Sequence, residues 1–166
     1  MFFLYQILIL ILLILSPIII IYRILKKKED TKRFKEKFCI PSKKRKAGNL
    51  IWFHGSSVGE FLSIIPLIHE LEKNKHINQI LITSSTLSSA EIFKNYKFKK
   101  VIHQFFPIDF FLYSYKFLNY WQPTITIFIE SEIWPSIFGA LNKKKIPLIL
   151  RNARITKKTF KKWMIV

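Results

Sequence analysis

From Asn49 onward, strand-length apolar runs alternate with stretches of helical periodicity, and this alternation limits the fold more than any other feature of the chain. Five short apolar strands separated by helices indicate a parallel sheet covered on both faces, and therefore an α/β fold. The strands are expected at Leu50–His54, Gln79–Thr83, Lys100–Phe105, Thr124–Glu130 and Pro147–Arg151, and the helices at Val58–Lys73, Ser89–Tyr96, Phe110–Tyr120 and Pro135–Lys144.

The first 22 residues form an apolar run that stands apart from this alternating region. As a helix, residues 1–22 would be about 33 Å long, which is enough to cross a bilayer. No charged side chain precedes the run, and Arg23 and Lys26 to Lys28 follow it, unlike the order in a cleaved signal peptide. The positive-inside rule then predicts a single-pass anchor with the rest of the chain in the cytoplasm. A monotopic helix that dips into one leaflet is the alternative.

A basic juxtamembrane connector, residues 23–48, links this run to the domain at residues 49–166. Twelve lysines and arginines lie between Arg23 and Lys46, and the net charge of the chain is +18. This charge favours anionic partners such as phospholipid head groups, although a solvated charged linker has the same composition. Nucleic acid is not an expected partner, because the aromatic residues are not interleaved with the basic clusters. One cysteine, Cys39, excludes an internal disulfide.

Polar residues follow each expected strand at the point where the strand ends. The carboxyl ends of parallel strands meet at one edge of a sheet, where open α/β sheets bind ligands. The sequence therefore predicts one cleft from five separated groups. These groups are His54–Glu60, Thr83–Thr86, Pro107 with Asp109, Glu130–Pro135 and Arg151–Arg154.

Several of these residues also have purely structural interpretations. Ser57 and Glu60 have the spacing of a helix capping box, and so do Ser88 and Glu91. Asp109 is expected to cap the helix that follows it.

Charge pairing offers a further structural interpretation. Glu130 ends an apolar strand, where a carboxylate is costly unless it is paired or functional. Arg151 and Arg154 are candidates to neutralise Glu130 and Glu132, or to hold an anionic ligand. The histidines show no metal-ligand spacing.

Taken together, the motifs resemble those of the Kdo transferases, glycosyltransferase family 30, in their N-terminal half. These enzymes transfer 3-deoxy-D-manno-octulosonic acid (Kdo) to lipid A precursors. The order and spacing of the motifs also agree with the family. The stretch His54–Glu60 resembles its H-A-x-S-V-G-E, Thr83–Thr86 its threonine-rich loop, Phe106–Asp109 its P-x-D turn, Glu130–Pro135 its E-T-E-L-W-P and Asn152–Arg154 its N-A-R.

The resemblance implies the Rossmann-like N-terminal half of a GT-B fold, which binds a lipid A precursor. CMP-Kdo would bind mainly to a C-terminal domain, and no metal or other cofactor would be required. Glu60 would be the general base that deprotonates the acceptor hydroxyl. The implied acceptor-binding residues are Ser57, Gly59, Thr83, Glu130, Glu132 and Arg154. The implied location is the bacterial inner membrane, in lipopolysaccharide core biosynthesis.

The sequence departs from the family pattern at three points. Gly55 stands where the family has alanine, and Leu87–Ser89 replace a proline, a threonine and a glycine. Because the sequence ends at Val166, the donor domain is expected to be absent. A fragment, one half of a split enzyme and a degenerate remnant all stay open. The alternative function is a non-enzymatic, membrane-anchored module that binds anionic lipid.

Overall fold

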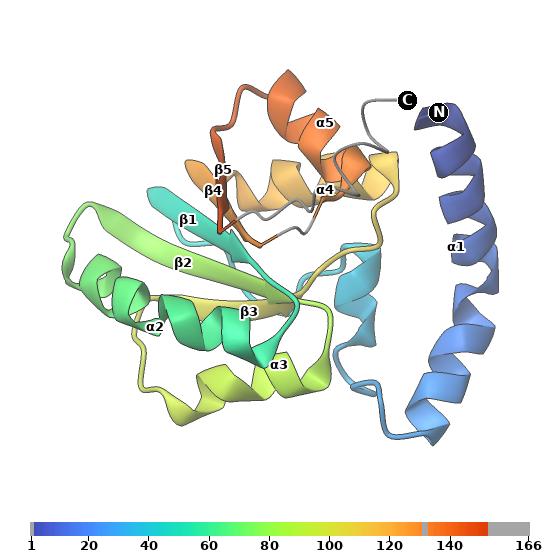
Figure 1. The fold of residues 1–166 in the computed structure, drawn as a ribbon, viewed down its shortest axis with the longest axis horizontal. Helices are drawn as coiled ribbons and strands as arrows, with labels where there is room; N and C mark the ends of the chain where they lie inside the picture. Colours follow the sequence, from blue (N-terminus) through green and yellow to red (C-terminus); the bar gives the residue numbers. More distant parts are fainter. Residues whose placement is uncertain (1, 131–132, 153–166) are drawn as a thin grey trace.

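The computed structural model describes residues 2–130 and 133–152, and it confirms the α/β fold with a fully parallel sheet of five strands (Figure 1). The strand order is β3-β2-β1-β4-β5. The strands are β1 (Asn49–His54), β2 (Ile77–Ser84), β3 (Val101–Phe105), β4 (Ile125–Ile129) and β5 (Leu148–Arg151). The helical elements are α1 (Phe2–Leu25), η1 (Phe34–Phe38), α2 (Val58–Lys73), α3 (Leu87–Ile92), η2 (Phe93–Asn95), α4 (Phe111–Trp121) and α5 (Pro135–Lys143).

Alternating side chains of the central strand β1 belong to two hydrophobic cores, one on each face of the sheet. Leu50 and Trp52 pack with residues of α4 and α5, whereas Phe53 packs with residues of α2 on the opposite face. Successive side chains of a strand point to opposite faces, so a strand covered on both sides is apolar throughout. Leu50, Trp52 and Phe53 are all fully buried. This double burial explains the short continuous apolar run in the sequence.

The direction in which the sheet is wound reverses at β1. The chain proceeds from β1 to β2 and β3 on one side, and then returns to place β4 on the other side of β1. At its carboxyl end β1 therefore pairs with both neighbours, and His54 lies opposite Thr83 of β2 and Phe128 of β4. A reversal of this kind opens a crevice beyond the strand ends, which is the usual ligand site of such sheets.

Two helix starts differ from those expected. The helix α3 begins at Leu87 with Thr86 as its N-cap, so the predicted capping box at Ser88 and Glu91 is wrong. Asp109 does not cap the following helix α4, whose N-cap residue Phe110 makes no side-chain cap hydrogen bond. Instead Asp109 accepts hydrogen bonds from the backbone N–H groups of Ser136 and Ile137 at the start of α5, both at 2.9 Å.

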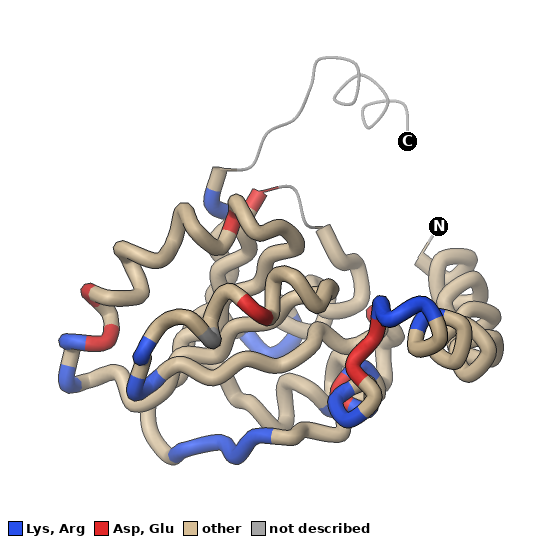
Figure 2. The backbone as a smooth tube through the Cα atoms, turned by 90° about the horizontal axis from the view of Figure 1, so that it is seen from below, with Lys and Arg blue, Asp and Glu red and all other residues tan. Residues whose placement is uncertain are grey.

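The connector after α1 packs against the domain and carries charges of both signs (Figure 2). Glu29 pairs with Arg23 at 2.9 Å and with Lys37 at 2.6 Å, and its carboxylate is almost fully buried. Further along, the guanidinium of Arg45 donates to the carbonyl oxygens of Trp121 and Gln122 at the end of α4. Part of the positive charge is thus used inside the fold, which argues against a solvated linker.

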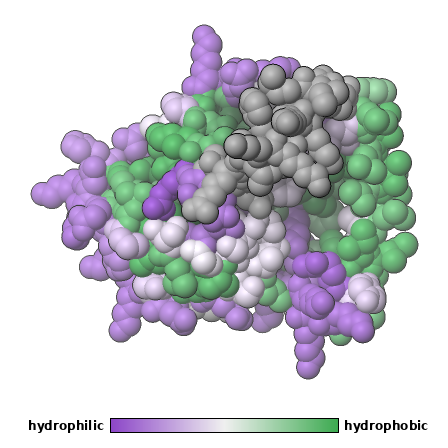
Figure 3. Space-filling model, in the orientation of Figure 1, coloured by the Kyte–Doolittle hydropathy of each residue, from purple (hydrophilic) through white to green (hydrophobic). Residues whose placement is uncertain are grey.

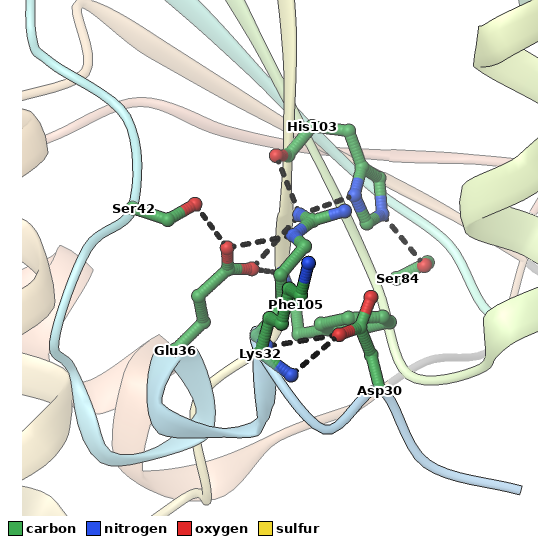
Figure 4. A network of polar contacts seen from close by, with 8 residues as sticks. Asp30, Lys32, Glu36, Ser42, Ser84, His103 and Phe105 are labelled. Carbon is green, nitrogen blue, oxygen red and sulfur yellow. Dashed lines mark hydrogen bonds and ion pairs between the residues drawn. The ribbon is translucent and has the colours of Figure 1, made fainter.

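Within the connector, the carboxylate of Glu36 is the centre of a buried polar network (Figure 4). It accepts hydrogen bonds from both Nε and Nη2 of Arg33, at 2.8 and 2.9 Å, and from the Ser42 hydroxyl. It also accepts the backbone N–H of Phe105 at 2.7 Å, at the end of β3. Glu36 therefore fixes the connector to the sheet.

The same network reaches the carboxyl end of β2. Nη2 of Arg33 lies 2.9 Å from the carbonyl oxygen of His103 and 3.0 Å from its Nδ1. The opposite ring nitrogen of His103 is 2.8 Å from the hydroxyl of Ser84, the last residue of β2 (Figure 4). Residues of the connector are in this way linked to the strand end that precedes the Thr86 loop.

The helix α1 stands beside the domain (Figure 1), and its N-terminal end contacts the loop after β3 and the starts of α4 and α5. The Tyr5 hydroxyl donates to Asp109 at 2.7 Å. The Gln6 side chain donates to the Ser136 hydroxyl at 2.7 Å and accepts the backbone N–H of Phe111 at 3.1 Å. By length and composition α1 is apolar enough to cross a membrane, with a mean hydropathy of 2.9 over its most apolar window.

Candidate functional site

Glu60 lies at the centre of the carboxyl edge, on the first turn of α2. Its Oε2 accepts the backbone N–H of Ser56 at 2.8 Å, and its Oε1 accepts that of Ser57 at 3.1 Å. The Ser57 hydroxyl in turn accepts the backbone N–H of Glu60 at 3.2 Å, which completes the predicted capping box. The carboxylate is thus held in one orientation, and each oxygen keeps a second lone pair for another donor.

The two glycines of this loop differ in what surrounds them: Gly55 is packed against the buried Glu60 carboxylate, whereas Gly59 faces open space. A Cβ atom built at Gly55 would lie 2.9 Å from Oε2 of Glu60, so the absence of a side chain there lets the loop close on the carboxylate. Gly59 is exposed, and a Cβ atom built on it meets nothing within 4 Å. Gly59 therefore leaves the surface beside Glu60 open to a ligand.

The loop after β2 supports the Glu60 loop from the side. The Thr86 hydroxyl caps α3 by accepting the backbone N–H of Ser89 at 3.3 Å. The Ser89 hydroxyl then donates to the carbonyl oxygen of Ser56 at 2.7 Å. Ser89 is buried, and it stands at one of the positions where the sequence departs from the family pattern. Its role was not apparent from the sequence, because the contact joins two loops that lie 33 residues apart.

Aromatic rings form the floor beneath three of the motif loops. The His54 ring stacks on Phe106 at a centroid distance of 3.9 Å, and Phe106 lies 5.2 Å from Trp134. These rings come from the ends of β1, β3 and the loop after β4, so one apolar cluster fixes the three loops relative to one another. Thr83 belongs to this lower layer: it is fully buried, and its hydroxyl accepts the Trp52 indole N–H at 2.8 Å. It supports the motif loops from below.

Glu130 follows β4 directly and has a left-handed backbone, with φ at +61°. Its side chain is exposed, and its backbone N–H donates to the carbonyl oxygen of Arg151 at 2.7 Å. A left-handed conformation costs a non-glycine residue about 1–2 kcal/mol, and such conformations cluster at functional sites. The geometry aims the Glu130 carboxylate away from the apolar strand and into solvent at the carboxyl edge.

Of the remaining charged residues predicted after β4 and β5, the structure describes only Arg151. The Arg151 guanidinium donates to the backbone oxygen of Ser63 on α2, at 3.3 Å. Glu132 and Arg154, predicted to bind acceptor, lie outside the described residues.

One titratable group close to the edge is structural. Asp109 is buried, and burial raises the pKa of its carboxyl, although hydrogen bonds from Tyr5, Ser136 and Ile137 act in the opposite direction. All of these partners belong to α1 or α5, so Asp109 joins these helices and its hydrogen-bonding capacity is used by them.

The Cys39 thiol is a second buried titratable group. Burial raises its pKa to about 12, which leaves it protonated and unsuited to act as a nucleophile at neutral pH.

The arrangement matches a known family over most of the chain. The family model described as 3-deoxy-D-manno-octulosonic-acid transferase (kdotransferase) matches residues 32–166, a range that includes the part of the connector with Glu36 as well as all the motif loops. The chain belongs to this family. As a Kdo transferase family member, it has the α/β fold of the N-terminal domain of a GT-B type enzyme.

Individual relatives agree with the family assignment. A probable 3-deoxy-D-manno-octulosonic acid transferase, mitochondrial, from Arabidopsis thaliana is 41% identical over 151 residues, covering 89% of this chain and 34% of the relative. The 3-deoxy-D-manno-octulosonic acid transferase of Rickettsia bellii is 40% identical over 148 residues, covering 88% and 35%. That of Haemophilus influenzae is 31% identical over 106 residues, covering 64% and 25%. The chain spans about a third of the length of the first two relatives.

Gly59 offers a test of acceptor binding that is separate from folding. We expect Gly59→Ala to leave the free energy of unfolding unchanged or to raise it by about 0.5–1 kcal/mol, since alanine favours a helix and the added methyl meets no atom. If Gly59 belongs to an acceptor site, as the family resemblance implies, the same methyl should weaken binding of a lipid A precursor, measured by titration in detergent micelles. Unchanged binding by this variant would remove Gly59 from the acceptor site.

Proposed function

We propose that this chain supplies the acceptor-binding half of an enzyme that transfers Kdo from CMP-Kdo to a lipid A precursor, in lipopolysaccharide core biosynthesis. The observation that carries the proposal is the Glu60 carboxylate, held by two backbone N–H groups at the carboxyl edge of the sheet, where the winding reverses. Membership of the Kdo transferase family supports the choice of sugar, and the names of the relatives support the reaction.

In this proposal Glu60 acts as the general base. A hydroxyl of the acceptor sugar donates to a free lone pair of the carboxylate, and Glu60 takes its proton as the oxygen attacks the anomeric carbon of Kdo. The new glycosidic bond forms while the bond to CMP breaks, and CMP leaves with the bonding electrons. The capping box contributes orientation, because it holds the carboxylate before the substrate arrives. We propose that this transfer needs no metal ion or other cofactor.

The remaining site residues have subsidiary roles in the proposal. Ser57 and Gly59 are exposed beside the base, and Glu130 follows the carboxyl end of β4, the strand that pairs with β1. Glu132 and Arg154 are proposed on the resemblance alone, with the arginine suited to a lipid phosphate. Thr83 is proposed to act through the loop it supports. The relatives are about three times as long as this chain, and we assign CMP-Kdo binding mainly to the part of such enzymes that it does not include.

We further propose that the protein is attached to the bacterial inner membrane through α1, with the domain on the cytoplasmic side. The basic residues at the C-terminal end of α1 support this orientation. The contacts of Tyr5 and Gln6 bear on the mode of attachment, since they hold the N-terminal end of α1 against the domain. These contacts would open if α1 crossed the bilayer as a single-pass anchor and would persist if it lay in one leaflet, so they distinguish the two modes of attachment.

The alternative, a non-enzymatic module that binds anionic lipid by charge, makes a different prediction about salt. We expect the chain in detergent micelles to keep binding a lipid A precursor at about 0.5 M salt, where interactions between exposed charges are screened within about 4 Å. Binding of phosphatidylglycerol should fall steeply over the same range. Equal loss of both lipids would favour the charge-binding module over the acceptor half.

A further inference from the structure

An apolar groove lies between the N-terminal half of α1 and the start of α5. Its volume is about 700 Å³, within the range of roughly 300–1,000 Å³ that is typical of small-molecule sites. Its lining among the described residues is almost entirely carbon, and consists of Phe2, Leu4, Tyr5, Ile7, Leu8, Ile11 and Pro135. Leu4, Leu8 and Ile11 have the spacing of one stripe along the helix, which forms the wall of the groove.

The groove has a fixed wall because α1 is held by polar contacts at the same level. Tyr5 itself lines the groove, while its hydroxyl donates to the buried carboxylate of Asp109. One turn of helix therefore supplies both the lining and the attachment. Gln6 adds two further hydrogen bonds, to Ser136 and to the backbone of Phe111. These contacts connect the groove to the loop that follows β3 and to the starts of α4 and α5.

The groove also adjoins the candidate site through Pro135. This residue ends the motif that begins with Glu130 and is the first residue of α5. Trp134, its neighbour, belongs to the aromatic floor under the Glu60 loop. A ligand with its polar part at the carboxyl edge can therefore extend an apolar part along α1 without leaving the molecule.

The rest of α1 suits contact with lipid, and its basic residues lie at the end of the helix opposite the groove. The outer face of α1 is an exposed apolar flank of the molecule (Figure 3), with Phe3 77% and Ile14 69% exposed. Arg23, Lys26, Lys27 and Lys28 lie in its last turn or directly after it. An apolar flank with lysines at one end suits the boundary between acyl chains and anionic head groups.

From these observations we propose that the groove between α1 and Pro135 receives one acyl chain of the lipid acceptor. The inference rests on the proposed function, because it takes the acceptor to be an acylated sugar. It makes α1 a part of the substrate site as well as a means of membrane attachment. The polar sugar would then lie towards Glu60 while the chain lies along Leu4, Leu8 and Ile11.

The test is photolabelling of the purified chain in phospholipid nanodiscs. One probe is a lipid A precursor with a diazirine on an acyl chain, and the other is phosphatidylethanolamine with the same diazirine chain. We expect the first probe to label residues 2–11 and the region of Pro135, and unlabelled precursor to compete. Leu8→Trp fills the groove and should lower this labelling about tenfold. This is the loss of affinity expected when about two methylene groups of the acyl chain are no longer buried.

Leu10→Trp is the matched control, because Leu10 is an exposed leucine of the same helix outside the groove lining. It should leave the labelling unchanged, and circular dichroism should give the same helix content for both variants. Even labelling around α1 by both probes would overturn the proposal and identify α1 as a simple lipid contact. Precursor labelling confined to the domain would overturn the groove but leave the proposed function standing. Labelling by phosphatidylethanolamine alone would overturn both.

Discussion

Replacing Glu60 by glutamine should lower Kdo transfer by about 10²–10⁴-fold in an enzyme completed with a donor domain, the range typical for loss of a general base. Glutamine keeps the length of the side chain and one acceptor oxygen, but its amide nitrogen cannot accept the second backbone N–H. Half of the capping interaction is thus lost, at a cost of about 1 kcal/mol in the free energy of unfolding. We therefore expect activity to collapse while the fold survives.

Glu70→Gln is the matched control for this variant. Glu70 lies on the same helix α2 and its side chain is 69% exposed, so the substitution removes the same charge far from the loop. Its transfer rate should stay within about twofold of the unmodified enzyme, because exposed ion pairs contribute little. Turnover by Glu60→Gln at the rate of this control would eliminate Glu60 as the general base.

The second large effect concerns stability. Glu36→Ala should lower the free energy of unfolding by about 3–5 kcal/mol, which is the cost of removing one partner from a buried ion pair. The substitution leaves the Arg33 guanidinium without its carboxylate and the Phe105 N–H without its acceptor. Since small domains have only about 5–15 kcal/mol of stability, a large part of the total is at stake. Urea unfolding of the chain in detergent, followed by circular dichroism, measures the difference.

Glu70→Ala is the control that separates the effect of burial from the loss of an ion pair. Glu36 and Glu70 each form an ion pair with a basic residue three positions away, but the Glu36 side chain is 1% exposed and the Glu70 side chain 69%. We expect a loss below about 0.5 kcal/mol for Glu70→Ala, as for exposed pairs in general. Similar losses for the two variants would mean that the Glu36 network does not attach the connector to the sheet.

Local sequence signals predict most of the strands and helices here, because they depend on short-range pattern. The Ser57–Glu60 capping box is an example: donor and acceptor lie within one turn, and the structure confirms it. Asp109 shows the limit of such signals. It stands just before a helix and has the chemistry of a cap, but the helix that it caps begins 26 residues later. Which helix Asp109 caps depends on the packing of α5 beside the loop after β3.

Burial of charged residues is equally hard to read from the sequence. The connector has the composition of a solvated segment, yet Arg33 and Glu36 reach partners about 70 residues away on β3. The sequence also does not predict which face of α1 contacts the domain, because every side of this helix is apolar. Tyr5 and Gln6 are the signal that was available, two polar groups within an apolar run. Their partners come from three-dimensional proximity to Asp109 and Ser136.

We propose that this chain is a competent acceptor half of a Kdo transferase. The experiment that tests this is Kdo transfer from CMP-Kdo to a lipid A precursor, by the purified chain with and without a separately supplied donor domain from a relative. We predict transfer only when both are present, and none when the chain carries Glu60→Gln. No transfer under either condition, with the chain folded by circular dichroism and still binding phosphatidylglycerol, would contradict the claim and favour the lipid-binding module.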